Sequence, residues 1–464
     1  MPAVFVHVSD IHFGQEKGDD RVHIHDDVKQ QLISDARHVV SNLANGVAHG
    51  ILVTGDIAQS GTKAEYDSAG EWLDELASSI GAEIHCVQMV PGNHDLDRSK
   101  LSLSGQAMLD HIRTGGPKEY EQVMNNPVDR AALFARFEDY GNFSFGYNCP
   151  LNDEGAFASE LEVNIAPGRS IRFIRLNSSL LCHGKERDED PELMIGARQF
   201  VIPRDDGVEN VILVHHPLSW YKDQEQVRQY VRSRARVFIS GHEHDPKVSV
   251  DSVDQGCDVL MLAAGATVPY HSDDIYTFTY NIIEFDWDEE IDGLSVTIHP
   301  RAWNPHRTCF ENDDKRLGGK DPNYRLNSPN FRVAPRPEVT PSSFPTEPIL
   351  AVEESTAPFV TEIGTVPVEH PTFKSSSSDT EGYEIARLRF FRDLFEGERL
   401  RILVELGALS ENFNERMNQG IERKLLDLLV REGKLEGIEN MIDQLVSERK
   451  DGGNDGQFST SYAN

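Results

Sequence analysis

Short β-branched and aliphatic runs alternate with longer amphipathic stretches along the first part of the chain. Val4–Val8, Ile51–Thr54 and His85–Val90 have the length and residue types of strands. Between them, Asp26–Ala48 and Glu65–Ser79 carry apolar residues at the spacing of an amphipathic helix. The pattern therefore predicts a β-α-β-α-β series.

A second series of strand-like runs follows further along the chain. These runs are Ile171–Leu176, Val211–Val214, Val237–Ser240, Val259–Ala263, Asn281–Phe285 and Leu294–His299. Each element must bury its apolar face against another layer, so two sheets flanked by helices are the simplest architecture for this order. The sequence predicts an α/β domain over residues 1–310.

Three further segments differ from this pattern. Residues from about 97 to 170 are less regular, include a predicted helix at Arg130–Tyr140, and are expected to form an inserted cap. Residues 311–378 are expected to form a partly disordered linker, because from about residue 331 the composition becomes rich in Pro, Ser, Thr and Glu and such a segment buries little apolar area. Apolar residues spaced by three and four then return, predicting a small helical domain at 379–449 before a disordered tail at 450–464.

Composition narrows the class of protein. The chain of 464 residues has a formal net charge of -32, which opposes non-specific binding to nucleic acid. No apolar run approaches the roughly 20 residues of a membrane helix, and the N-terminus lacks the basic and apolar regions of a signal peptide. Five widely spaced cysteines contain no C-x-x-C pair. We expect a cytoplasmic protein with reduced thiols and no membrane association.

Metal-ligand residue types follow one predicted strand after another. Any one of them is explained by a turn or a buried structural histidine, but the repetition at strand ends is not. In His-x-His the two imidazoles lie on the same side of an extended segment, which suits one metal or two adjacent ones. The residues concerned are Asp10 and His12, Asp56, the run Gly92-Asn93-His94-Asp95, His215 and His216, and His242 and His244.

These residues resemble the calcineurin-like metallophosphoesterases. The likeness consists of D-x-H at Asp10, G-D at Asp56, G-N-H-D at 92–95, a histidine at His215 and G-H-x-H at 241–244. The ordered set covers residues 10–244. The family fold, a two-sheet β-sandwich flanked by helices, agrees with the layers inferred from periodicity.

The resemblance implies a pair of divalent metal ions. It places Asp10, His12, Asp56 and His244 around one ion, and Asp56, Asn93, His215 and His242 around the other, with Asp56 bridging. Imidazole and carboxylate ligands suit Mn, Fe or Zn better than Ca or Mg, and Mn is favoured here.

The implied mechanism is attack on phosphorus by a metal-activated hydroxide. The family pattern makes His94 the general acid that protonates the leaving oxygen, with Asp95 orienting and charging its imidazole. A loop-bracing role for His94 is the structural alternative.

Four further residues are weaker candidates for substrate binding. Arg98 could reach a substrate phosphate, although a solvated surface arginine is an equal alternative. His216 could line the site or simply pack. Tyr270 and His271 could contribute to the rim of the pocket.

The ligand set does not distinguish among phosphoesters. The leading hypothesis is a phosphodiesterase acting on a nucleotide or nucleic acid, because the loop from Asp95 to Arg98 and the long insert resemble bacterial phosphodiesterase-type members. The overall acidity favours a small cyclic nucleotide over a nucleic acid. The alternatives are a phosphomonoesterase, acting on a protein or a small molecule, and a metal-binding scaffold without turnover.

The C-terminal apolar pattern resembles the effector-associated, death-like adaptor domains of bacterial conflict systems. It covers Arg387–Phe395, Leu400–Val404 and Leu425–Glu436. The resemblance implies a bacterial defence effector that a flexible linker tethers to a module binding a protein partner. A plain oligomerising helical bundle is the alternative. On the tethered interpretation, deleting residues 379–464 leaves catalysis intact.

Overall fold

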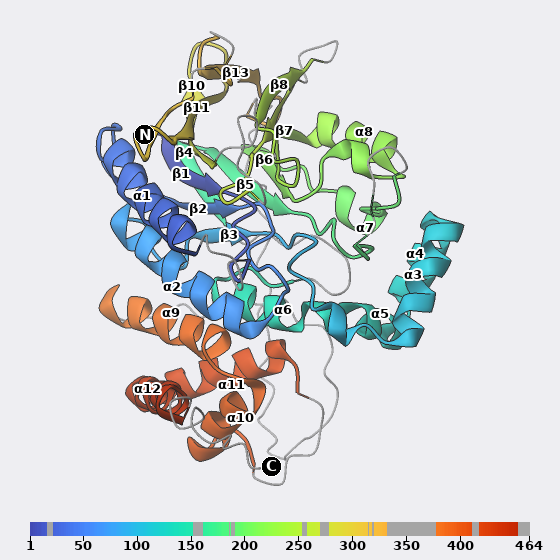
Figure 1. Ribbon diagram of the computed structural model, residues 1–464, viewed down its shortest axis with the longest axis vertical. Helices are drawn as coiled ribbons and strands as arrows, with labels where there is room; N and C mark the ends of the chain where they lie inside the picture. The colour runs from blue at the N-terminus through green and yellow to red at the C-terminus, as the bar shows by residue number, and fades with distance from the viewer. Residues whose placement is uncertain are drawn as a thin grey trace, which may run out of the picture.

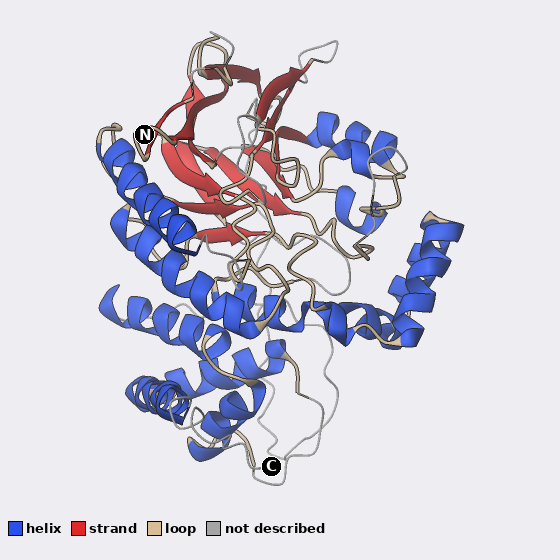
Figure 2. Cartoon of the chain, viewed as in Figure 1, coloured by secondary structure: helices blue, strands red, loops and turns tan. Residues whose placement is uncertain are grey.

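The structure is a computed structural model that describes residues 1–15, 22–151, 161–184, 186, 191–252, 258–269, 278–313, 315–317, 320–331, 377–410 and 417–452. Two sheets pack together, helices cover their outer faces, and a group of C-terminal helices lies below them in the view of Figure 1. Figure 2 shows strands confined to the upper part of the molecule and helices around and below them. The predicted fold class is confirmed.

The first sheet has the strand order β12-β11-β10-β1-β2-β3, and β13 pairs with β11. Parallel pairing of β1 with β2 and of β2 with β3 matches the predicted β-α-β-α-β series. The third strand is shorter than predicted because Cys86 closes a turn by donating its N–H to the Glu83 carbonyl. The strands are β1 (Ala3–Val8), β2 (Gly50–Val53), β3 (Val87–Met89), β10 (Thr279–Asp288), β11 (Gly293–Asn304), β12 (Cys309–Asn312) and β13 (Asn323–Asn327).

The second sheet has the order β4-β5-β6-β7-β9-β8. Its strands are β4 (Glu162–Ala166), β5 (Arg169–Arg175), β6 (Val208–Val214), β7 (Ala235–Ser240), β8 (Lys247–Asp251) and β9 (Val259–Ala263). Apolar side chains from both sheets form one core between them, where the rings of Phe5 and Phe173 lie 4.9 Å apart. The two sheets therefore pack as a sandwich.

Helices cover the outer faces of the sandwich. A second apolar core lies beneath them, and it includes Val28, Leu32, Leu73 and Leu76. The helices are α1 (Val22–Ser41), α2 (Lys63–Ser79), α7 (Ala197–Phe200) and α8 (Gln224–Arg234), with the 3-10 helix η3 (Leu218–Trp220).

The inserted segment is helical. Its elements are η1 (Arg98–Lys100), α3 (Leu103–Gly115), α4 (Pro117–Asn125), α5 (Pro127–Phe134), η2 (Ala135–Phe137) and α6 (Glu138–Gly146). The helix predicted at Arg130–Tyr140 is split at η2, and β4, which falls inside the predicted cap range, belongs to the second sheet. The buried Arg136 donates to the Leu180 and Cys182 carbonyls, which fixes the insert against the loop after β5.

The first sheet continues past residue 310, inside the segment predicted as linker. There β13 pairs with β11, and Phe331 is fully buried in the core between the sheets. Glu209 holds this end of the chain by accepting from the backbone N–H of Asn330 at 3.0 Å. The remainder of the predicted linker to 376, and the tail from 453, lie outside the described residues.

The C-terminal helices are α9 (Ser377–Arg392), α10 (Glu396–Glu405), α11 (Gln419–Arg431) and α12 (Leu435–Gly452). Leu394, Ile402, Leu426 and Ile442 are among the buried residues of their shared core. Among the described parts of the chain, no helix has the length and apolarity needed to cross a membrane.

Candidate metal centre

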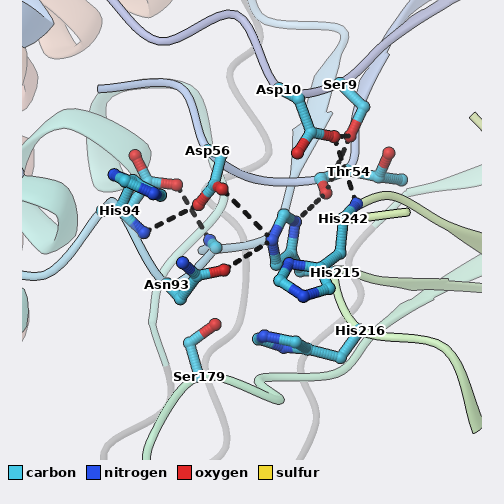
Figure 3. Close-up of polar contacts among 12 residues, drawn as sticks. Ser9, Asp10, Thr54, Asp56, Asn93, His94, Ser179, His215, His216 and His242 are labelled. Atoms are coloured by element: carbon cyan, nitrogen blue, oxygen red, sulfur yellow. Dashed lines mark hydrogen bonds and ion pairs between the residues drawn. The ribbon is translucent and has the colours of Figure 1, made fainter. Parts of the chain in front are cut away.

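The predicted ligands gather at one edge of the sandwich. They follow β1, β2 and β3 of the first sheet and β6 and β7 of the second, and within each sheet these strands run parallel. The carboxyl ends of parallel strands meet at the same edge, where α/β folds bind their ligands. Figure 3 shows the side chains from these loops pointing toward one another.

The backbone at this edge is held in an uncommon conformation. Asp10 and His12 have φ of 53°, Asp56 of 51° and His242 of 68°. These make up four of the seven non-glycine residues with positive φ in the described part of the chain. Each such residue costs about 1–3 kcal/mol and persists where the surroundings enforce it, typically at functional sites.

Two glycines allow the loops to approach each other. A Cβ on Gly92 would lie 2.1 Å from Asp56 Oδ1, which is far inside contact distance. Gly55 has φ of 94°, and a Cβ there would meet His215 Nδ1 at 2.5 Å. The G-D and G-N-H-D motifs thus need their glycines for close approach to the neighbouring ligand loop.

Asp56 lies at the centre of the cluster. Its Oδ2 is 3.4 Å from Nε2 of His12 and 3.4 Å from Nε2 of His215. Its Oδ1 accepts the backbone N–H of His94 at 2.7 Å. The carboxylate is buried, so it can reach a ligand on either side without competing bulk water.

Hydrogen bonds to the backbone fix the tautomers of these two imidazoles. His215 Nδ1 is 2.8 Å from the Thr54 carbonyl, and His12 Nδ1 is 3.3 Å from the Val268 carbonyl. A carbonyl oxygen only accepts, so both Nδ1 atoms donate and both Nε2 atoms face Asp56. This arrangement of second partners is typical of metal-ligating histidines.

A positive charge is needed between the Asp56 carboxylate and the imidazoles of His12 and His215. A neutral imidazole Nε2 and a carboxylate oxygen are both acceptors, and they face each other here at hydrogen-bond range. Burial lowers the pKa of His215, but the Asp56 carboxylate outweighs it and raises the pKa to about 9. The protein thus favours a cation at this position, either a proton or a metal ion.

A second group of ligands surrounds Asp10. Its Oδ2 accepts from Ser9 Oγ at 2.5 Å and from the His242 backbone N–H at 3.2 Å. Its Oδ1 is buried, has no hydrogen-bond donor among the described residues, and lies 3.3 Å from His244 Nε2. Asp10, His12 and His244 bring ligand atoms within 4.8 Å of one another. This cluster corresponds to the first predicted set.

The second predicted set also comes together. Asn93 Oδ1 lies 3.1 Å from His215 Nε2, and the His242 ring is 5.1 Å from the His215 ring. Oxygen and imidazole donors converge in both sets, so the residues present fit two divalent ions of the kind that bind nitrogen and oxygen. The metal identity and the role of each residue stay predictions.

His94 lies beside the first set. Its Nδ1 is 2.9 Å from the Gln59 carbonyl and therefore carries a hydrogen. A ring nitrogen of His94 lies within 4.8 Å of ligand atoms of His12 and Asp56. Nε2 is thus the atom of His94 that can hold or release a proton next to the cluster.

The structure corrects the expectation for Asp95. The carboxylate does not contact the His94 imidazole; it is buried and accepts from the backbone N–H groups of Ile57, Ala58 and Gly92 at 3.2, 2.9 and 2.8 Å. Tyr66 OH donates to the same carboxylate at 3.0 Å. Burial and the nearby Asp56 charge raise the pKa of Asp95 to about 6, against the effect of these hydrogen bonds. Asp95 joins two ligand loops instead of orienting His94.

The four weaker candidates have different outcomes. The exposed Arg98 donates to the Asn93 carbonyl at 3.4 Å, which places its guanidinium beside a ligand loop. His216 is fully buried, contacts Ser178 Oγ at 2.8 Å through Nδ1, and packs 4.4 Å from the His242 ring. Tyr270 and His271 lie outside the described residues.

Sequence reasoning missed the groups that hold the ligands. The carbonyls of Thr54, Gln59 and Val268 each accept from a site imidazole. A backbone carbonyl leaves no mark in residue type, so no pattern could have identified these three. Ser9 is different because its hydroxyl, next to Asp10, was an available signal.

A two-sheet sandwich with carboxylates and imidazoles at its shared strand ends is the architecture of a metallophosphoesterase. This chain belongs to the calcineurin-like phosphoesterase family, which it matches over residues 3–246. The family uses divalent metal ions and hydrolyses phosphoesters, and the ligand clusters described above lie within the matched range.

Residues 382–444 match a second family, the GTPase-associated adaptor domain. This match covers α9 to α12 from residue 382 onward and confirms the predicted resemblance to adaptor domains.

Individual relatives are distant. The chain is 22% identical over 294 residues to the uncharacterized metallophosphoesterase-like protein YydB of Bacillus subtilis (strain 168), covering 60% of this chain and 57% of the relative. The chain thus spans little more than half the length of that curated relative. Among solved structures, purple acid phosphatase PPD1 from yellow lupin is 12% identical with a TM-score of 0.35, covering 65% of this chain and 52% of that chain. The 5'-nucleotidase from Candida albicans is 13% identical with a TM-score of 0.30, covering 64% and 50%. TM-scores this low support no inference about activity.

Proposed function

We propose that this chain is a dinuclear-metal phosphodiesterase acting on a nucleotide or nucleic acid. One observation carries the proposal: the Nε2 atoms of His12 and His215 converge on the same oxygen of Asp56, with each Nδ1 held by a carbonyl. A carboxylate shared by two imidazoles whose Nδ1 atoms are fixed in this way would suit a pair of metal ions.

Asp10, His12 and His244 would hold one ion, and Asn93, His215 and His242 would hold the other, with Asp56 available to both. When bound, two such ions lower the pKa of water and neutralise charge on the phosphoryl oxygens. Asp10 and Asp56 supply the negative charge that retains the ions, and Asn93 supplies a neutral oxygen. Manganese is the favoured metal, with iron or zinc as alternatives.

His94 acts as the general acid in this proposal. Its Nδ1–H is committed to the Gln59 carbonyl, which fixes the ring and leaves Nε2 to deliver a proton to the leaving oxygen. Arg98, beside the Asn93 loop, binds a phosphoryl oxygen of the substrate.

Arg98 also lies beside the loop that follows β5, which carries charged residues. The Arg98 guanidinium packs against Gly184, since a Cβ at that glycine would lie 3.1 Å from Arg98 Cζ. The loop that contains Gly184 also carries Glu186. Further along, Glu192 lies 3.2 Å from His183. Glu186 and Glu192 are both paired with His183. The preference for a diester therefore rests on the likeness of the 95–98 loop and the insert to phosphodiesterase-type members, not on the charge of the loop after β5.

Hydrolysis of two model esters tests the proposal. The protein is supplied with Mn²⁺ and assayed on bis-p-nitrophenyl phosphate beside p-nitrophenyl phosphate, with Asp56→Ala as the control. Diester cleavage that Asp56→Ala abolishes supports the proposal. Preference for the monoester supports a phosphomonoesterase instead, and inactivity with Mn, Fe and Zn supports a metal-binding scaffold.

We further propose that the C-terminal domain recruits a protein partner, as its family's description as a GTPase-associated adaptor suggests. Leu428 of α11 is 44% exposed and is a suitable position to disturb such a contact. Leu428→Glu should abolish partner capture or self-association, measured by sedimentation, while the diesterase activity is retained.

A further inference from the structure

The C-terminal helical domain packs directly on the phosphoesterase domain. Phe145 of α6 is buried in the core of the helical domain, with its ring 4.3 Å from that of Phe391. A Cβ on Gly146 would lie 2.9 Å from the Leu388 carbonyl oxygen, so α6 and α9 are in contact at the backbone. Figure 1 shows α9 lying alongside α6 and below α2. The domain is not a separate body on a tether.

Arg392, the last residue of α9, makes the main polar contact across this interface. Its guanidinium donates to both carboxylate oxygens of Asp74 on α2 at 2.8 Å and to Tyr147 OH at 3.1 Å. Its own carbonyl accepts from Lys63 at 3.0 Å. The Arg392 side chain is only 11% exposed, so these bonds are sheltered from water.

Three aromatic residues continue inward from Arg392. The Tyr147 ring lies 5.2 Å from the Phe143 ring, and Phe143 stacks on Tyr66 at 4.9 Å with an interplanar angle of 28°. All three are buried. We call Tyr147, Phe143 and Tyr66 the aromatic bridge.

The bridge ends at the metal centre. Tyr66 OH donates to Asp95 Oδ1, and the Asp95 carboxylate holds the loop after Asp56 and the loop before Asn93 through three backbone N–H groups. A shift of the Tyr66 ring therefore moves the Asp95 carboxylate, which sets the distance between the two ligand loops. Packed interiors transmit such shifts because few voids are available to absorb them.

We propose that the helical domain positions the metal centre through the aromatic bridge, with Arg392 at one end and Asp95 at the other. Arg392 is then a positioning residue that acts on metal affinity without touching a metal ligand. The proposal rests on the proposed function only for its activity readout, because metal affinity can be measured without a substrate.

The first test compares two arginines of the same helix in the full chain. Arg392→Met removes the contacts to Asp74 and Tyr147 together with a pair to Asp393 within the helical domain. The control, Arg389→Met, removes ion pairs to the same Asp393 and to Asp443 and leaves the interface intact. Calorimetric Mn²⁺ titration should show about tenfold weaker binding for Arg392→Met and unchanged binding for Arg389→Met, because coupling through packed side chains reaches about this size. Diesterase kcat should fall for Arg392→Met at subsaturating Mn²⁺ and recover at saturating Mn²⁺, with KM for the ester little changed. Wild-type Mn²⁺ affinity in Arg392→Met would overturn the proposal.

A double-mutant cycle separates positioning from general destabilisation. Tyr66→Phe keeps the stacked ring and removes only the hydroxyl donor to Asp95. Sites that act independently have additive effects to within about twofold. We expect the Arg392→Met/Tyr66→Phe double variant to bind Mn²⁺ no more weakly than the weaker single variant. If the double variant instead lost Mn²⁺ affinity by the product of the two single losses, the aromatic bridge would not connect Arg392 to Asp95.

The outcomes distinguish this proposal from the proposed function. Mn²⁺ binding by the wild type without turnover contradicts the phosphodiesterase, while the cycle on metal affinity still tests the bridge. Turnover by the wild type with unaltered Mn²⁺ affinity in Arg392→Met overturns the bridge alone. Near-ultraviolet circular dichroism of each variant verifies that its aromatic core is folded.

Discussion

The metal centre and the interface between the two domains are both buried and polar, but they are built differently. At the metal centre each side chain follows directly on a strand, so position in the chain determines position in space. At the interface the partners are brought together only by tertiary packing, as for Arg392 with Asp74, which lie 318 residues apart. The first kind of site leaves a local pattern in the sequence and the second does not.

The backbone conformation also differs between the metal centre and the interface. The metal centre uses positive φ at Asp10, His12, Asp56 and His242, which is stable only because the surrounding loops enforce it. The interface uses close approach, with Gly146 of α6 against the backbone of α9. The metal centre is therefore sensitive to which residue type stands at each position, whereas the interface is sensitive to any increase in side-chain volume.

The largest expected effect is on catalysis at the metal centre. His94→Asn removes the proton donor while keeping a polar side chain, so cleavage of a diester with an alkoxide leaving group should fall by about 10²–10⁴-fold. Cleavage of bis-p-nitrophenyl phosphate should fall much less because its leaving group needs no proton. Steady-state kcat on the two substrates measures this difference. Equal losses on both would remove His94 from the role of general acid.

The next effect concerns the helical domain itself. Arg399 and Glu422 form an ion pair at 3.0 Å with side chains 3% and 2% exposed. Arg399→Met leaves the Glu422 charge buried and should cost about 3–5 kcal/mol of unfolding free energy in chemical denaturation. Arg401→Met, whose pair with Glu405 is about half exposed, is the matched control and should change stability by about 0.5 kcal/mol or less.

The same variant has a defined pH dependence. Burial raises the pKa of Glu422 even with Arg399 beside it, and removing the arginine raises it further. A carboxyl whose pKa is raised on folding stabilises the protein below its unfolded pKa and loses that contribution as pH rises through the folded pKa. The loss of unfolding free energy in Arg399→Met, relative to the wild type, should therefore become smaller as the pH is lowered. A deficit that grows at low pH would show that Glu422 is not the group responsible.

The sequence predicted the sandwich, and it also identified the candidate ligands that the structure brings together at one edge, because strand-forming residues and metal-ligand types adjoin each other. It did not predict β13, since Asn323–Asn327 contains one apolar aliphatic residue, Leu326, and gains its stability from pairing with β11. The split of the insert at η2 was also missed. The role of Asp95 was misread because its partners are backbone N–H groups, which every residue type but proline provides.

Asp95 connects the two regions, and its substitution should have an intermediate effect. Asp95→Asn replaces one acceptor oxygen by an NH₂ group that faces backbone donors, so the two ligand loops lose part of their connection. Mn²⁺ affinity should fall by about 10–100-fold, measured by calorimetry. Asp97→Asn is the control because Asp97 caps the short helix η1 through Ser99 and does not hold a ligand loop. Comparable losses in both variants would show that the loop responds to any charge removal.

The smallest expected effect tests the interface by volume alone. Gly146 and Gly141 both belong to α6, but an added Cβ meets the Leu388 carbonyl oxygen at 2.9 Å at the first position and only Gln419 Nε2 at 3.9 Å at the second. Gly146→Ala should therefore cost about 1–3 kcal/mol in thermal denaturation by forcing α9 away from α6, whereas Gly141→Ala should be neutral or slightly stabilising. If the helical domain positions the metal centre, Gly146→Ala should also weaken Mn²⁺ binding although no polar group has been removed. A stability loss with unchanged Mn²⁺ affinity would mean that the interface holds the domains together without reaching the metal centre, and the two regions would then be independent.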